Sequence, residues 1–234
     1  MQMKHIKIKS DIVDDDTGTF YEWFGLSAAY PAQVESILAE DDNEEVVVDI
    51  NSPGGDVFAA SEIYTLLSQY QGNVTINIQG LAASAASVIA MAGDKVKISP
   101  TAQMMIHKAH SASSGNTDDF QHQSEVLAGV DESIANAYEA KTGLKRTDLL
   151  NMMAQETWLT AQEAVDKGFA DEVMDFTATP QFLNSSQGPK ITKAKVEQWK
   201  QIMAKAKAYD EKMASLNQAK NDKTKLQAKI GLLF

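Results

Sequence analysis

Residues 44–70, EEVVVDINSPGGDVFAASEIYTLLSQY, decide the fold that we predict for this chain. The β-branched run at 44–50 is typical of a strand that is buried on both faces. The glycine pair in NSPGG, residues 51–55, predicts a tight break, and residues 57–70 have the apolar spacing of an amphipathic helix. The stretch therefore predicts a strand, a glycine turn and a helix in direct succession.

Residues 73–93, NVTINIQGLAASAASVIAMAG, repeat this order. We expect the strand to end at Gly80 and a helix of small residues to begin near Ser84. Repeated strand–helix units are typical of a mostly parallel sheet with helices on its faces.

The same apolar spacings and turn residues predict the remaining helices and strands on either side of these two segments. We expect a turn at 14–18, strands at 5–13, 95–99, 102–108 and 169–176, and helices at 31–40, 117–141, 146–154 and 160–168. We place the start of the helix at 117–141 at Thr117. Asp118 and Asp119 would then lie in its first turn, where acidic residues interact favourably with the helix dipole. Proline at the start of the 31–40 segment and Gly168 at the end of the 160–168 segment are typical helix boundaries.

Composition limits the class of protein. The chain has 234 residues, of which 44% are hydrophobic and 23% charged, as in soluble globular proteins. It has 0 cysteines, which excludes disulfides, thiolate metal sites and a cysteine nucleophile. We see no apolar run of about 18 residues and no secretory signal, so we expect a cytoplasmic protein without a membrane span.

Charge divides the chain into two parts. Residues 191–234 carry ten lysines and four acidic residues, a net +6, so residues 1–190 carry the remaining −17. An acidic body repels nucleic acid, so we expect it to bind none. We predict one catalytic domain at 1–176, a linker at 177–190 rich in Thr, Ser, Gln, Gly and Pro, and a basic amphipathic helical tail at 191–234.

Two segments offer parts of a nucleophilic site. Ser84 would lie at a helix N-terminus, where positive potential suits a nucleophile, and the N–H groups near Gly54 and Gly55 could stabilise an oxyanion. Each feature has an ordinary alternative: a helix cap or packing residue for Ser84, and a plain turn for the glycines. Ser87, one turn further, is a rival that we expect to pack in the interior.

A base and an acid are less sharply defined. His107 ends an apolar strand, where a general base could be held rigidly, although a buried structural histidine fits equally well. His110 and His122 are weaker candidates. Candidates for the acid that orients the imidazole are Asp148, Glu156 and Asp171. The chain has no His-x-x-x-His, calcium-loop or phosphate-loop pattern, so we expect no metal and no cofactor.

Together, these motifs resemble one family. NSPGG, GLAAS, MIH and the segment WLTAQEAVDKGFAD, residues 158–171, occur in the order and nearly the spacing of the Clp protease proteolytic subunits, over about residues 40–175. The resemblance implies a serine peptidase with the α/β ClpP/crotonase fold, a spiral of β-β-α units. Here it would be followed by the helical tail.

The resemblance also implies roles for individual residues. Ser84 would be the nucleophile, His107 the general base and Glu156 the acid of the triad. The backbone N–H groups of Gly55 and Ala85 would form the oxyanion hole. Substrate strands would bind Gly54 and the main chain of Lys108 and Ala109, in the handle segment that follows His107.

Departures from the family pattern suggest a subtype. Glu156 stands where the family usually has Asp, and Gln155 replaces an Arg that helps join two rings. With the N-terminal thirty residues and the tail, these features look more like the ClpP-like proteases of tailed phages and prophages, which process capsid and scaffold precursors in the prohead. This resemblance implies a homo-oligomeric ring acting on protein substrates, with capsid or scaffold partners and no ATP use by this chain.

Two other classes of function stay open at this point. A crotonase-type acyl-CoA enzyme would share the fold and the oxyanion pair, but it needs no Ser–His–acid set. An inactive assembly protein would keep the protease-like body and the basic helix without the chemistry.

Overall fold

The computed structural model describes residues 4–39 and 44–176. The predicted linker at 177–190 and tail at 191–234 lie outside the described residues. The elements in chain order are β1 (Lys4–Ile12), α1 (Asp15–Trp23), α2 (Pro31–Leu38), β2 (Val46–Gly55), α3 (Val57–Gln69), β3 (Val74–Ala83), α4 (Ala85–Ala90), β4 (Lys95–Ile98), β5 (Gln103–Ile106), α5 (Thr117–Thr142), α6 (Arg146–Ala154), β6 (Thr157–Thr160), α7 (Ala161–Asp166) and β7 (Glu172–Val173).

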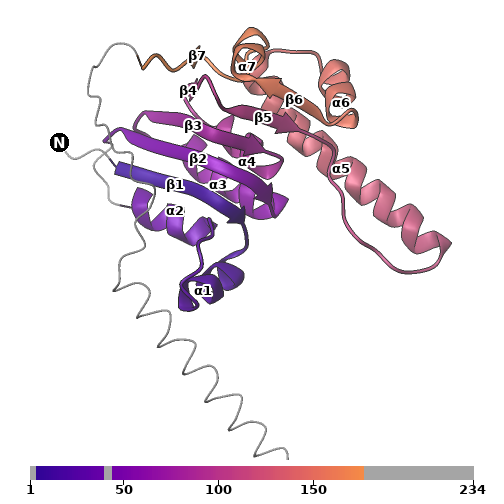
Figure 1. The fold of residues 1–234 in the computed structure, drawn as a ribbon. Helices are drawn as coiled ribbons and strands as arrows, with labels where there is room; N and C mark the ends of the chain where they lie inside the picture. The colour runs from indigo at the N-terminus through magenta and orange to yellow at the C-terminus, as the bar shows by residue number, and fades with distance from the viewer. Residues whose placement is uncertain (1–3, 40–43, 177–234) are drawn as a thin grey trace, which may run out of the picture. The chain divides into compact units, whose positions relative to one another are not determined.

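A largely parallel sheet organises the described residues (Figure 1). Its main path runs β1-β2-β3-β4-β7, and every pairing on this path is parallel. The long strand β3 serves two neighbours, because its residues 75–78 pair with β4 and residues 81–83 pair with β5. The short strand β6 then pairs with β5 in antiparallel fashion. The predicted α/β class is confirmed.

The core lies between this sheet and the helices α2, α3 and α4, which lie on one of its faces (Figure 1). Strands β1, β2 and β3 contribute alternate aliphatic side chains that are almost completely buried, as expected where helices cover one face of a sheet. The largest of these strand residues are Ile6, Ile8, Ile12, Ile50, Ile76 and Ile78. Helix α3 adds Ile63 and Leu67, and α4 adds Ile89.

The predicted tight break at 51–55 is wrong, because β2 continues through it to Gly55. Asp11 and Ile12 of β1 pair with Gly54 and Gly55, after a shift of register in the preceding residues. The predicted strand end at Gly80 is also too early. Strand β3 runs to Ala83 because its second half gains β5 as a partner. Both extensions carry the main chain up to Ser84.

The predicted turn at 14–18 is instead the start of helix α1. Asp14 caps this helix, since its carboxylate accepts a hydrogen bond from the Thr17 N–H at 2.8 Å. Gly18 is tolerated inside the helix because the Tyr30 ring packs against it; a Cβ at this position would lie 2.3 Å from a ring carbon. Tight packing, rather than a turn, explains this glycine.

The C-terminal part of the body differs from the sequence expectation in two places. Strand β6 was not predicted, because four residues that end directly at a helix carry little periodic signal. The strand expected at 169–176 is reduced to Glu172–Val173. The helices expected at 117–141 and 146–154 are confirmed at Thr117–Thr142 and Arg146–Ala154.

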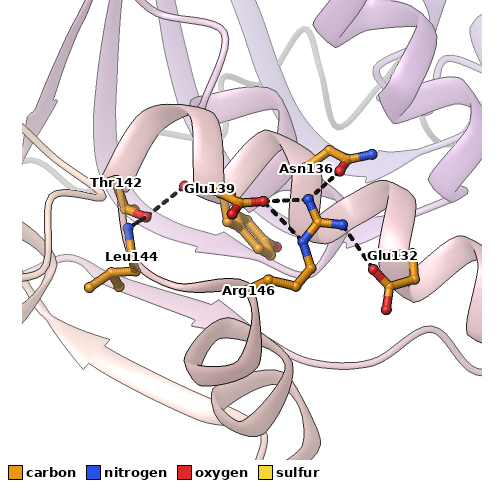
Figure 2. Close-up of polar contacts among 7 residues, drawn as sticks. Glu132, Asn136, Glu139, Thr142, Leu144 and Arg146 are labelled. Atoms are coloured by element: carbon orange, nitrogen blue, oxygen red, sulfur yellow. Dashed lines mark hydrogen bonds and ion pairs between the residues drawn. The ribbon is translucent and has the colours of Figure 1, made fainter.

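A polar corner fixes α6 against the C-terminal half of α5 (Figure 2). Arg146, the first residue of α6, forms ion pairs with Glu132 and Glu139 and donates a hydrogen bond to Asn136. All three partners belong to α5. Since α6 leads directly to Glu156, this corner helps to set where the predicted acid lies.

Candidate active site

Three parallel strands deliver the candidate residues to one edge of the sheet. Strand β2 ends at Gly55, Ser84 follows the end of β3, and His107 follows the end of β5. Since β2 and β5 both pair in parallel with β3, the three carboxyl ends meet. They surround a cavity of about 130 Å³, which is lined by Gly55, Val57, Ser84, Ala85, Val88, His107, Ala109, His110, Ile134 and Tyr138.

Ser84 and His107 are in direct contact across this cavity. The Ser84 Oγ lies 2.7 Å from the His107 Nε2, a hydrogen-bond distance. The Ser84 backbone has φ 54° and ψ −126°, which a serine rarely adopts. Its N–H donates to the Met105 carbonyl at 2.9 Å, so the turn is tied to β5 just before His107. This geometry suits proton transfer from a serine hydroxyl to an imidazole.

The glycine pair keeps the space beside Ser84 open. A Cβ on Gly54 would lie 2.8 Å from the Ser84 Cβ and 3.0 Å from the Ala85 nitrogen. At Gly55 a Cβ would lie 2.0 Å from the Ile12 carbonyl oxygen of β1. Both glycines have positive φ, 105° and 149°. The absence of a side chain thus lets the backbone at Gly54 approach the nucleophile and the backbone at Gly55 approach β1.

Burial lowers the pKa of the His107 imidazole. The pKa of His107 is lowered from its ordinary value, first because the ring is half-buried and then because His110 lies beside it, with ring centroids 5.2 Å apart. The carboxylates of Glu156 and Asp131 act in the opposite direction. A lowered pKa keeps the ring neutral, and therefore able to accept a proton, near neutral pH.

Glu156 lies near His107 without contacting it. Ile106 pairs with Thr157 in the antiparallel β5–β6 ladder, so continuing this register places Glu156 opposite His107. Its carboxylate is exposed and accepts a hydrogen bond from the Trp158 indole at 3.3 Å. Among the described residues, no hydrogen bond joins Glu156 to His107. The structure thus brings the charge to the site but does not form the hydrogen bond between acid and imidazole that completes a triad.

The other predicted acids lie outside the cavity. Asp148 is exposed in the first turn of α6. Asp171 accepts hydrogen bonds from the Val96 N–H and from Lys141. Asp131, which sequence reasoning missed, is buried on α5, and its carboxylate accepts a hydrogen bond from the Ala109 N–H at 2.7 Å. An aspartate inside a long helix gives no sequence signal for such a role.

The handle residues are already engaged within the chain. The Lys108 N–H donates to the Met153 carbonyl, and the Lys108 ammonium lies 3.6 Å from the Asp131 carboxylate. Since the Ala109 N–H also has an internal partner, neither N–H group is available to a substrate strand. His110 lines the cavity, whereas His122 is exposed on α5.

Ser87 and Tyr138 lie directly behind the nucleophile. Ser87 is fully buried, as the sequence suggested, and its hydroxyl bonds both the Ser84 carbonyl and the Tyr138 hydroxyl. Sequence reasoning gave no role to Tyr138, which reaches the site from α5, 54 residues after Ser84. Its position on the apolar face of a helix would be the only available signal.

Metal binding and membrane insertion find no support among the described residues. These residues contain no group of three or more His, Cys, Asp or Glu side chains that could hold a metal ion. Within the same residues, no helix is long and apolar enough to cross a membrane.

Comparison with known proteins gives a consistent result. The family model described as Clp protease matches residues 26–177. The ATP-dependent Clp protease proteolytic subunit of Deinococcus radiodurans is 31% identical over 148 residues, which are 62% of this chain and 72% of the relative. Proteolytic subunit 1 of Leifsonia xyli subsp. xyli is 34% identical over 149 residues, 62% of this chain and 74% of the relative.

A third relative agrees with these two. The proteolytic subunit of Ligilactobacillus salivarius is 30% identical over 151 residues, which are 64% of this chain and 77% of that protein. The family match covers more than half of the chain and includes the ends of β2, β3 and β5, where the cavity lies. This chain belongs to the Clp protease family and is a serine-type peptidase.

Proposed function

We propose that this peptidase cleaves peptide bonds with Ser84 as nucleophile and His107 as general base. The observation that carries the proposal is the 2.7 Å contact between the Ser84 hydroxyl and the His107 Nε2, made beside an open cavity. Glu156 would act mainly through its negative charge, which favours the imidazolium that forms during the reaction.

The reaction is an acyl transfer in two halves. The Ser84 oxygen attacks the substrate carbonyl while His107 takes the hydroxyl proton, and the Gly55 and Ala85 N–H groups would stabilise the resulting oxyanion. His107 then gives the proton to the leaving amine, which leaves an acyl group on Ser84. In the second half, water attacks this ester while His107 takes one of its protons; His107 then returns that proton to the Ser84 oxygen as the bond to the acyl group breaks and the acid product leaves.

The internal hydrogen bonds of Lys108 and Ala109 limit how a substrate strand could bind beside the cavity. We propose that a substrate strand lies along the cavity between Gly54 and the handle segment that follows His107. Because the N–H groups of Lys108 and Ala109 are engaged, main-chain pairing would use their carbonyl groups or the residues after Ala109.

The decisive experiment compares Ser84→Ala with Ser99→Ala on a fluorogenic short peptide. Ser99 is a buried serine that directly follows β4 and does not line the cavity. We expect Ser84→Ala to lose activity on the order of a million-fold and Ser99→Ala to stay within a few-fold of wild type. Peptide cleavage by Ser84→Ala near the wild-type rate would refute the proposal.

For the biological role, we propose processing of phage capsid or scaffold precursors during head maturation, in the bacterial cytoplasm. The glutamate at 156, the N-terminal segment and the basic segment at 191–234 support this, since they resemble the phage-encoded subtype. We propose that small-peptide cleavage by this chain needs no ATP, so added ATP should leave the rate unchanged.

Assembly into a closed ring is part of the same proposal. The N-terminal region exposes several large apolar side chains close together in sequence, among them Phe20, Phe24, Leu26 and Trp23, which is 80% exposed. Such a group is expensive to leave in water, so burial between copies would stabilise an oligomer. Light scattering should give a mass of about six or seven chains, whereas a fully active monomer would contradict the ring.

The tail proposal is tested by truncation after Phe176. If residues 177–234 serve recruitment rather than chemistry, the shortened chain should keep short-peptide hydrolysis within a few-fold of wild type. Intact mass spectrometry of wild type and Ser84→Ala tests self-processing at the same time, because only the active chain could remove its own tail. A folded, truncated chain without peptidase activity would refute this division of labour.

A further inference from the structure

Behind the nucleophile lies a buried hydrogen-bonded chain that the mechanism so far does not use. The Ser87 hydroxyl donates to the Ser84 carbonyl oxygen at 2.5 Å, and it lies 2.7 Å from the Tyr138 hydroxyl. Ser87 is 0% exposed and Tyr138 is 1% exposed. No other hydrogen bond of the Tyr138 hydroxyl is present among the described residues.

The direction of this chain follows from the chemistry of its members. A carbonyl oxygen can only accept, so the single Ser87 hydroxyl hydrogen points to Ser84. The Tyr138 hydroxyl must then donate to the Ser87 oxygen. Burial raises the pKa of Tyr138 well above its ordinary value, which keeps this donor protonated. The order is therefore Tyr138 to Ser87 to the Ser84 carbonyl.

The Ser84 carbonyl controls the N–H group of Ala85. Peptide bonds in the described residues are trans, so the C=O of Ser84 and the N–H of Ala85 point in opposite directions. Bonds from the Ser87 N–H at 2.9 Å and from the Ser87 hydroxyl hold that carbonyl toward the interior. The Ala85 N–H is thereby directed to the other side, where the missing Gly54 side chain leaves room beside its nitrogen.

The anchor at the far end of the chain is firm. The Tyr138 ring packs edge-on against Phe169, with ring centroids 5.6 Å apart, and the Tyr138 main-chain carbonyl accepts a hydrogen bond from the Thr142 hydroxyl. Asp131, two turns earlier on the same helix, binds the Ala109 N–H. Helix α5 therefore contacts both the segment that follows the base and, through Ser87, the turn of the nucleophile.

We infer that Ser87 and Tyr138 are positioning residues that aim the Ala85 N–H at the substrate oxyanion. The hydroxyl chain holds the Ser84–Ala85 peptide unit in its unusual conformation and so preorganises one of the two oxyanion donors. This inference rests on the proposed function, and it adds two residues that act through the Ser84–Ala85 peptide unit rather than on the reacting atoms.

The test measures kcat and KM of Ser87→Ala, Tyr138→Phe and the double variant on a short peptide. We expect kcat to fall about tenfold in Ser87→Ala and about threefold in Tyr138→Phe, with KM within twofold, because donor aim matters only in the transition state. Since Tyr138 acts through Ser87, the double variant should match Ser87→Ala rather than multiply the two losses.

A transition-state analogue distinguishes a change in the direction of the Ala85 N–H group from a general loss of protein stability. A peptide boronic acid forms a tetrahedral adduct with an oxygen in the oxyanion position, so its affinity should fall by the same factor as kcat/KM in each variant. The controls are Ser99→Ala and Tyr70→Phe, which remove a buried serine hydroxyl and a tyrosine hydroxyl bond to the Glu44 carbonyl elsewhere in the body. Both should leave kcat and boronate affinity unchanged.

Three results would overturn the inference: kcat of Ser87→Ala within twofold of wild type, unchanged boronate affinity despite reduced kcat, or multiplicative losses in the double variant. Ser84→Ala distinguishes this failure from failure of the proposed function. If Ser84→Ala is inactive while Ser87→Ala is normal, the positioning role alone is refuted. If Ser84→Ala is active, the nucleophile assignment fails as well.

Discussion

Two turns beside the cavity hold a non-glycine residue at positive φ, and they are built very differently. Ser84 has φ 54° and Glu156 has φ 48°. The turn at Ser84 is bonded through its N–H, its carbonyl and its side chain, to β5, α4 and His107. The turn at Glu156 has an exposed side chain whose one hydrogen bond in the described residues goes to Trp158.

The difference indicates that the turn at Ser84 is held more rigidly than the side chain of Glu156. A strained conformation persists only where several interactions determine it, and those at Ser84 are mostly buried. The nucleophile is therefore held in the geometry of the reaction before substrate binds. The acid is held loosely, so its contribution should be a charge effect and smaller than that of the base.

The largest difference is expected on the nucleophile side. His107→Ala removes the base that is hydrogen-bonded to Ser84, so kcat/KM should fall about 10⁴- to 10⁶-fold. A thermal melt within a few degrees of wild type would show that the fold is intact. A loss of less than a hundredfold in a folded protein would mean that another group takes the Ser84 proton.

Filling the space beside the nucleophile should cost less. In Gly54→Ala the new Cβ would lie 2.8 Å from both the Ala83 carbonyl and the Ser84 Cβ, so we expect kcat to fall about 10²- to 10³-fold. The matched control is Gly25→Ala, because Gly25 also has positive φ, 71°, but nothing lies within 4 Å of its Cβ position. Equal losses in the two variants would attribute the effect to backbone strain rather than to the cavity.

Substitution of Glu156 should reduce activity less than substitution on the nucleophile side. Glu156→Gln keeps the shape and removes the charge, so kcat should fall about tenfold to a hundredfold, well short of the His107→Ala effect. Glu156→Asp tests reach, since the family usually has Asp at this position. If Glu156→Gln proved as damaging as His107→Ala, the side chain would have to bond His107 directly during the reaction.

The smallest effect is a shift of the pH profile. Activity needs neutral His107, and burial lowers its pKa, so the acid limb of kcat/KM should lie below the ordinary histidine value of about 6.5. His110→Gln removes a neighbour that lowers this pKa and should move the limb to higher pH. Glu156→Gln removes a charge that raises it and should move the limb to lower pH. Shifts in the opposite directions would contradict this electrostatic account.

The sequence allowed most of the nucleophile side to be predicted. Ser84 and His107 directly follow the ends of parallel strands, and the ends of strands can be approximately located from apolar runs and glycines. The strand lengths were less predictable. NSPGG looked like a break, but β1 supplied a partner that carried β2 through it, and partners are a property of tertiary structure.

The acid side and the supporting residues were harder to find. Glu156 was one of three candidate acids, and only the family resemblance selected it, because it lies between α6 and a four-residue strand with no periodic signal. Asp131 and Tyr138 come from the middle of a long helix and reach the site only because α5 packs against α4 and α6. Long-range packing of this kind leaves no local pattern in the sequence.

The measurement that tests the central claim most directly is the site and pH dependence of labelling by a fluorophosphonate probe. The account predicts a single adduct, mapped by peptide mass spectrometry to Ser84, with a labelling rate that follows the deprotonation of His107 and falls strongly in His107→Ala. Ser84→Ala should take up no probe. An adduct on another serine, or equal labelling of Ser84 in wild type and His107→Ala, would contradict the account.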